Sequence, residues 1–282
     1  MRLLFLTLLT LSAMAETVSL NGKKLYYTDS GSGPQSLILI HGWACDHSFF
    51  QGQWKDLSKD YRVIALDLPG HGQSEMATPL TMEGFAMAVD AVRRAAKVDK
   101  PIMIGHSMGA TVAREHARRN PNVARALIFL DGSIFQLPPI EADRERWSET
   151  ISSMAKSFGP ANEKQVRERN ISVFLSNMYA ESTPREFRMM VLRKILATAP
   201  ETAQGAMQSM ADLKLWREDV LQIPVLALRA GQRPPPNEEA YLKTLFPKLQ
   251  YKFMPGVSHF LMLEKPAEVN SEIRAFLKGN KF

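Results

Sequence analysis

The sequence predicts an α/β fold with a mostly parallel central sheet, helices on both of its faces and an inserted helical cap. Three observations support this prediction. Short, continuously apolar runs alternate with longer segments of helical periodicity, as they do in βαβ units. A long segment between two of these runs contains no convincing strand. A glycine-flanked serine stands directly between one apolar run and an amphipathic segment.

The expected strands are short runs of apolar and β-branched residues. Residues 36–40 (Ser-Leu-Ile-Leu-Ile) are typical of a strand that is buried on both faces of a sheet. Similar runs predict the other strands, at residues 24–28, 63–66, 102–104, 126–130, 224–228 and 249–253. The spacing of apolar residues between these runs predicts helices at residues 50–57, 81–96, 110–119 and 266–277.

Residues 134–215 interrupt the alternation of strands and helices. They are rich in Glu, Arg, Met, Ala and Gln, and prolines divide them into several helical segments. A helical insertion between two parallel strands lies over the carboxyl edge of the sheet, where open α/β sheets bind ligands. We therefore expect residues 134–215 to form a cap on a core made of residues 16–133 and 216–282.

The first fifteen residues have the pattern of a secretory signal peptide. Arg2 supplies the positive charge, residues 3–11 are apolar apart from two threonines, and Ala13-Met14-Ala15 has the small-x-small form of a cleavage site. The apolar run is shorter than the roughly 20 residues that span a bilayer. We expect cleavage after Ala15, export to the periplasm or the medium, and no stable membrane insertion. An uncleaved N-terminal anchor is the alternative.

Charge and cysteine content exclude several functional classes. The net charge is +6, but the cationic residues are scattered and interrupted by acids, unlike a nucleic-acid-binding stripe. The single cysteine, Cys45, excludes an intramolecular disulfide, and we expect it to be a small buried hydrophobe. The sequence contains no dinucleotide fingerprint, P-loop or cluster of metal ligands. We therefore expect a small-molecule substrate and no cofactor, metal or nucleic acid, and leave the oligomeric state open.

Residues 105–109 (Gly-His-Ser-Met-Gly) have the G-x-S-x-G pattern of a nucleophile elbow. They follow an expected strand and precede an expected helix, which is the context that the pattern requires. The central residue of such a turn has a strained backbone, and small residues on either side allow the strand and the helix to approach closely. Ser107 is therefore the candidate nucleophile.

Backbone amides near Ser107 are the candidate oxyanion donors. His41-Gly42-Trp43 follows the expected strand at 36–40, and the His-Gly pair allows the amide of Trp43 to point inward. The amide of Met108, directly after the nucleophile, is the second donor. Two amides aimed at one point form an oxyanion hole.

His259 is the candidate base. It lies in a loop between the last expected strand and the last expected helix, and a late histidine matches the chain order nucleophile, acid, histidine. His71 lies in a turn-rich loop that we expect to be structural. The side chain of His106 is expected to point away from Ser107, and His47 and His116 are expected on helices as surface or packing residues.

These motifs together resemble those of the α/β-hydrolase family over essentially the whole mature chain. The matching segments are residues 41–43, 67–74 (Asp-Leu-Pro-Gly-His-Gly-Gln-Ser), 105–109 and 259–266. The resemblance implies that Ser107 is the nucleophile, His259 the base, and the amides of Trp43 and Met108 the oxyanion donors. The chain looks like the capped subgroup of esterases, lipases and C–C hydrolases.

The sequence departs from the family pattern at the catalytic acid. The family usually places an aspartate after the strand that corresponds to residues 224–228, where this chain has Arg229-Ala230-Gly231-Gln232-Arg233. Asp131 ends the neighbouring strand at 126–130, and some family members, including haloalkane dehalogenases and certain lipases, are similar in carrying the acid there. Asp131 is therefore the preferred acid, with Glu238 and Glu239 as alternatives.

A serine nucleophile indicates acyl transfer, which excludes the aspartate-dependent dehalogenase and epoxide hydrolase reactions. Methionines and phenylalanines of the cap favour an uncharged acyl or aromatic ester as substrate. We therefore predict a serine carboxylesterase acting on a small or medium apolar substrate through an acyl-enzyme. The alternatives are cleavage of a C–C, lactone or N-terminal peptide bond, and a hydrolase-like ligand receptor.

Overall fold

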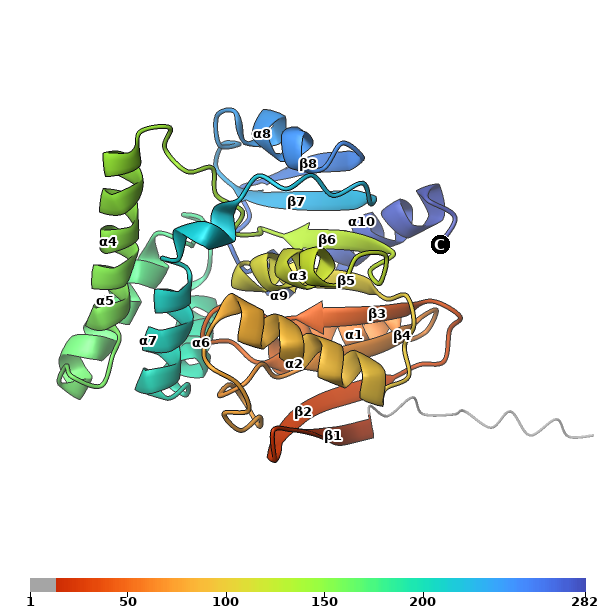
Figure 1. Ribbon diagram of the computed structural model, residues 1–282, viewed down its shortest axis with the longest axis horizontal. Coiled ribbons are helices and arrows are strands. Elements are labelled where there is room, and N and C mark those ends of the chain that lie inside the picture. The colour runs from red at the N-terminus through yellow and green to blue at the C-terminus, as the bar shows by residue number, and fades with distance from the viewer. Residues whose placement is uncertain (1–13) are drawn as a thin grey trace, which may run out of the picture.

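The computed structural model describes residues 14–282, so that most of the expected signal peptide lies outside the described residues. An eight-stranded sheet has the order β1-β2-β4-β3-β5-β6-β7-β8 (Figure 1). β1 pairs antiparallel with β2, β2 pairs antiparallel with β4, and all other neighbours are parallel. The strands are β1 (Met14–Leu20), β2 (Lys23–Ser30), β3 (Ser36–Ile40), β4 (Arg62–Leu66), β5 (Ile102–His106), β6 (Ala126–Leu130), β7 (Val225–Gly231) and β8 (Leu249–Pro255).

Helices cover both faces of the sheet, as the alternating sequence pattern predicts. One face is covered by α2 (Met82–Ala95) and α3 (Met108–Arg119), and the other by α1 (Gln51–Leu57) and α10 (Pro266–Gly279) (Figure 1). The shorter helices are η1 (His47–Phe50), η2 (Leu213–Trp216), α8 (Glu238–Leu245) and α9 (Leu261–Glu264). Because both faces are covered, every residue of β5 and β6 is buried, which explains their continuously apolar sequences.

Four helices separate β6 from β7 in the chain. They are α4 (Glu141–Ser157), α5 (Lys164–Ser176), α6 (Arg185–Leu196) and α7 (Pro200–Ser209). They lie beyond the carboxyl ends of the parallel strands, on one side of the sheet domain (Figure 1). The predicted fold class, including the helical cap, is confirmed, and all four helices fall within the expected residues 134–215.

The elements that the sequence did not predict include β1 and α8. β1 is an edge strand whose residues are exposed or half-buried, so it lacks the apolar run by which the central strands were recognised. Its first two residues, Met14 and Ala15, also belong to the expected signal peptide. α8 has only eight residues and follows three consecutive prolines. No helix in residues 14–282 is long and apolar enough to cross a membrane.

Candidate active site

Ser107 lies in a strained turn between β5 and α3. Its backbone has φ 50° and ψ −121°, a conformation that is uncommon for a residue with a side chain. A Cβ atom on Gly105 would lie 2.3 Å from the carbonyl oxygen of Gly109. A Cβ atom on Gly109 would lie 2.1 Å from the carbonyl oxygen of Ile40. The two glycines therefore allow β3, β5 and α3 to approach closely enough to form the turn, as the sequence predicts.

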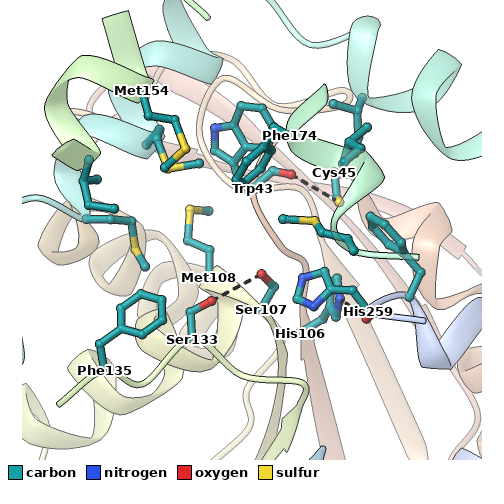
Figure 2. Close-up of a pocket in the computed structure, with 17 residues that line it drawn as sticks. Trp43, Cys45, His106, Ser107, Met108, Ser133, Phe135, Met154, Phe174 and His259 are labelled. Atoms are coloured by element: carbon teal, nitrogen blue, oxygen red, sulfur yellow. Dashed lines mark hydrogen bonds between the residues drawn. The ribbon is translucent and has the colours of Figure 1, made fainter. Parts of the chain in front are cut away.

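A largely apolar cavity of about 190 Å³ lies above this turn, between the sheet edge and the cap. Figure 2 shows Ser107 at its base, between Ser133 and His259. Seventeen of the described residues line it, and none of them is a lysine, an arginine, an aspartate or a glutamate. The lining residues are Trp43, Cys45, His106, Ser107, Met108, Ser133, Phe135, Ile151, Met154, Phe174, Leu175, Met178, Ile195, Met207, Met210, His259 and Phe260.

His259 lies in the loop between β8 and α9, and its imidazole borders the cavity beside Ser107 (Figure 2). The Nδ1 atom lies 2.5 Å from Oδ2 of Asp131, so an N–H at Nδ1 donates to the carboxylate. That tautomer leaves Nε2 without a proton and able to accept one. The backbone N–H of His259 donates to the carbonyl of Met178 in the cap, at 2.8 Å.

Asp131 follows β6 and is only 7% exposed. Its Oδ1 atom accepts a hydrogen bond from the Ala230 amide at 3.0 Å and lies 3.1 Å from Nη1 of Arg229. Burial alone would raise the pKa of Asp131, but the hydrogen bond and charge of His259, the charge of Arg229 and the Ala230 amide together lower it. Asp131 is therefore an ionised carboxylate at neutral pH.

The two alternative acids lie elsewhere. Glu238, at the start of α8, accepts a hydrogen bond from the Tyr251 hydroxyl at 2.8 Å and lies 3.2 Å from Nε of Arg229. Glu239 pairs with Lys243 on the surface. Within residues 14–282, Asp131 is the only carboxylate at ion-pair distance from His259. The geometry therefore favours Asp131 over both glutamates as its partner.

The two expected oxyanion donors flank the nucleophile. Trp43 and Met108 both border the cavity, and neither backbone amide has a hydrogen-bond acceptor among residues 14–282. A Cβ atom on Gly42 would lie 3.1 Å from Cβ of Ser107, so glycine allows the loop after β3 to approach the nucleophile. The Trp43 indole donates to the carbonyl of Ala203 in α7, at 2.7 Å. This bond ties the loop that carries one amide to the cap.

His106 supports His259, a contact that the sequence did not predict. Its Nε2 atom lies 3.0 Å from the carbonyl oxygen of His259, to which an N–H donates, and the two ring centroids are 4.7 Å apart. Burial and the nearby charge of His259 lower the pKa of His106 to about 3. His106 is therefore neutral and holds the backbone of the loop rather than exchanging protons.

The remaining histidines have structural environments. Burial and the charge of His41 lower the pKa of His71 to about 3, and its Nδ1 contacts the carbonyl of Pro69. The His47 ring contacts Asp67, which also accepts hydrogen bonds from the backbone amides of His47 and Gln73. His116 is buried in α3 beside Asp90. None of these three borders the cavity.

Two further polar side chains border the cavity. The hydroxyl of Ser133 lies 3.4 Å from that of Ser107, on the side opposite His259 (Figure 2). Cys45 is 2% exposed, and its thiol donates to the carbonyl of Trp43 at 3.3 Å. Burial raises the pKa of the Cys45 thiol, which is thus neutral. The site therefore offers a hydroxyl nucleophile rather than a thiolate. Residues 14–282 contain no cluster of three metal-ligating side chains.

Comparison with known proteins places this geometry in context. A family model described as "Alpha/beta hydrolase family" matches residues 37–272. The pimeloyl-[acyl-carrier protein] methyl ester esterase of Proteus mirabilis is 31% identical over 66% of this chain and 69% of its own length. The protein of the same name from Nitrosospira multiformis is 25% identical over 90% of this chain and 98% of its own. A solved thermophilic esterase from Thermogutta terrifontis superposes with a TM-score of 0.76 at 24% identity, covering 95% of this chain and 99% of that chain, which shows a shared fold.

Proposed function

Because the chain belongs to the alpha/beta hydrolase family, we propose that it is a serine esterase that cleaves carboxylic esters of small, uncharged substrates. One observation carries the proposal: Ser107 and His259 border the same apolar cavity, and His259 is held by the buried carboxylate of Asp131. A hydroxyl, an oriented imidazole and a carboxylate are the parts that acyl transfer to serine requires. The names of the bacterial relatives, which are methyl ester esterases, support the same class of reaction.

In the first half of the proposed reaction, Ser107 attacks the ester carbonyl while its proton passes to Nε2 of His259. The carbonyl π electrons move to oxygen, and the amides of Trp43 and Met108 stabilise the oxyanion. The intermediate collapses as the alkoxy group leaves and takes the proton from His259. The products are the free alcohol and an acyl ester of Ser107.

In the second half, His259 removes a proton from water as the water oxygen attacks the acyl carbonyl. The intermediate then expels Ser107, which recovers the proton from His259, and the acid is released. In both halves Asp131 fixes the imidazole tautomer and stabilises the transient imidazolium, and it is not itself protonated.

The cavity supports the proposed substrate class. No charged side chain of the described residues lines it, so a carboxylate or phosphate bound there would lose its hydration without gaining a partner. Its volume of about 190 Å³ is below the roughly 300–1,000 Å³ of sites for drug-sized ligands. Methionine side chains supply much of the wall and adapt to irregular apolar shapes. These features favour short, unbranched or small branched acyl groups.

Two experiments test the proposal. A fluorophosphonate is expected to label Ser107 covalently, since the reagent reacts with an activated serine. Among p-nitrophenyl esters, kcat/KM is expected to be highest for acetyl to butyryl groups and to fall about tenfold or more at decanoyl, because the cavity cannot hold the longer chain. Absence of both labelling and ester turnover would contradict the proposal. Turnover of lactones, amides or diketones in preference to esters would place the activity on another bond.

We further propose that the protein is exported. The pattern of charge, apolar run and Ala-x-Ala site in residues 1–15 supports this proposal. Expressed in a bacterial host, the exported protein is expected to have an intact mass that begins at Glu16. Recovery of the full-length chain from the cytosolic fraction would contradict export.

A further inference from the structure

Arg229 lies near the end of β7, the strand after which the family usually carries its catalytic acid, and its side chain contacts Asp131, the candidate acid of this chain. It lies on β7, next to the end of β6, and its side chain is 24% exposed. Its Nη1 atom lies 3.1 Å from Oδ1 of Asp131 and donates to the carbonyl of Gly132 at 3.3 Å. The guanidinium therefore contacts both the acid and the turn that carries it.

The two oxygens of Asp131 have separate partners. The Arg229 guanidinium and the Ala230 amide approach Oδ1, while Oδ2 faces Nδ1 of His259 at 2.5 Å. With Oδ1 held from two directions, the carboxylate cannot rotate without losing both interactions. The oxygen that faces the imidazole is thus held in one orientation.

Arg229 is itself held from its other side. Glu238 lies 3.2 Å from Nε of Arg229, and the Tyr251 hydroxyl donates to the same Glu238 oxygen at 2.8 Å. Burial raises the pKa of Glu238, and the charge of Arg229 opposes this shift. The Glu238 carboxylate partly neutralises Arg229, so that Asp131 keeps more of its negative charge available to His259.

We propose that Arg229 is a positioning residue for the reaction proposed above: it fixes the carboxylate of Asp131 against His259, and Glu238 and Tyr251 fix Arg229 in turn. The inference rests on the proposed function, because it requires Asp131 to act through His259. A guanidinium suits this position because its charge is spread over separate nitrogens, so that Nη1 lies at ion-pair distance from Asp131 while Nε lies at ion-pair distance from Glu238.

The main test compares Arg229→Met with Arg233→Met, its control, since Arg233 is an exposed arginine in the segment directly after β7. Arg229→Met is expected to lower kcat roughly ten- to a hundredfold, because small misplacement of a catalytic group has effects of this size, with KM changed about twofold at most. Arg233→Met is expected to keep the wild-type kcat. Rates are divided by the concentration of sites that a fluorophosphonate titrates, so that loss of folded protein does not count as loss of rate.

Two further variants separate positioning from simple support of the fold. Arg229→Lys is expected to have an intermediate kcat, because lysine keeps the positive charge but not the planar guanidinium group. Added guanidinium ion is expected to raise the kcat of Arg229→Ala severalfold, with no effect on Arg233→Ala. If Arg229→Met does not fold, the lysine and alanine variants carry the test.

The inference is overturned if kcat per titrated site is the same for Arg229→Met and Arg233→Met, or if guanidinium leaves Arg229→Ala unchanged. Ser107→Ala and Asp131→Asn show which claim has failed. If both lower kcat about a hundredfold or more while Arg229→Met does not reduce it, only the positioning role is wrong. If Ser107→Ala keeps its turnover, the proposed function is wrong, whatever the arginine variants do.

Discussion

The turns after β5 and β6 lie side by side at the carboxyl edge of the sheet and are built alike. Ser107 directly follows one strand and Asp131 the other, and both have positive φ, 50° and 45°. Each donates its backbone N–H to a carbonyl of the neighbouring strand, Ser107 to that of Leu130 and Asp131 to that of Leu228. Residues held in such sparsely populated conformations are often found at functional sites.

The two turns differ in what determines the residue at their centre. Around Ser107 one determinant is local, because a Cβ atom on Gly105 would meet Gly109 within the same turn, and a second comes from the adjacent strand, because a Cβ atom on Gly109 would meet Ile40 of β3. Around Asp131 the determinants are distant, because its side chain contacts Ala230 and His259, 99 and 128 residues away in the chain. The position of the nucleophile is therefore set by its own turn and the strand beside it. The acid, by contrast, can come from any strand end that reaches the histidine.

Removing the Ser107 hydroxyl tests the role of the turn after β5. Ser107→Ala is expected to lower kcat at least about a thousandfold and to abolish fluorophosphonate labelling, since only oxyanion and binding effects remain. Thermal unfolding is expected to be nearly unchanged or slightly improved, because the strained turn is retained with a smaller side chain. Turnover above about one thousandth of the wild-type rate would point to a different nucleophile.

Removing the Asp131 carboxylate tests the role of the turn after β6. Asp131→Asn is expected to reduce kcat about a hundredfold or more, with a smaller change in KM, because the imidazole loses its fixed tautomer and the charge that stabilises it. Glu239→Gln is the matched control and is expected to be silent. Glu238→Gln is expected to lower kcat only severalfold through Arg229. If instead Glu238→Gln is the more damaging change, the acid lies after β7, as in most of the family.

Gly109→Ala tests the close packing of α3 on β3 without changing a reacting group. Gly109→Ala is expected to destabilise the protein by about 1–3 kcal/mol, because the added methyl group meets the backbone of Ile40 rather than a flexible side chain. Gly279→Ala, in α10, is the control, since a Cβ atom there has no neighbour within 4 Å. Equal stability of the two variants in urea unfolding would show that the turn tolerates a wider approach of strand and helix.

The sequence allowed the central strands, the cap and the elbow to be predicted because each follows from short-range pattern. Apolar runs indicate strands that are buried on both faces, and a Gly-x-Ser-x-Gly pattern between a strand and a helix indicates the nucleophile elbow. Asp131 was inferred because Arg229 stands where an acid was expected and because Asp131 comes at the end of the neighbouring expected strand. The reason for that arginine was not accessible from sequence, since its partners Asp131 and Glu238 meet only through the pairing of β6 with β7 and the placement of α8.

Contacts between the core and the cap were equally inaccessible. The amide of His259 bonds to Met178, and the indole of Trp43 bonds to Ala203, so both sides of the reaction centre are tied to cap helices. No periodicity in either segment indicates these pairs, because each joins residues more than 80 positions apart through backbone carbonyls that every residue possesses. The same is true of Ser133, whose position beside Ser107 depends on the adjacency of β5 and β6.

The dependence of the unfolding free energy on pH tests the charge of Asp131. The pKa of Asp131 in the folded protein is lowered from its ordinary value of 3.8, so its ionised form stabilises the fold. This contribution is complete above that ordinary value and is lost as the pH falls through the lower folded value. The difference in unfolding free energy between the wild type and Asp131→Asn should therefore be largest near neutral pH and shrink at acidic pH.

Ser107→Ala carries no such charge, so its difference from the wild type should not depend on pH. Urea unfolding of the three proteins across the acidic range measures both differences. A wild-type advantage over Asp131→Asn that stays constant on acidification would mean that the carboxylate contributes by packing and hydrogen bonding alone, without the charge that the imidazolium needs.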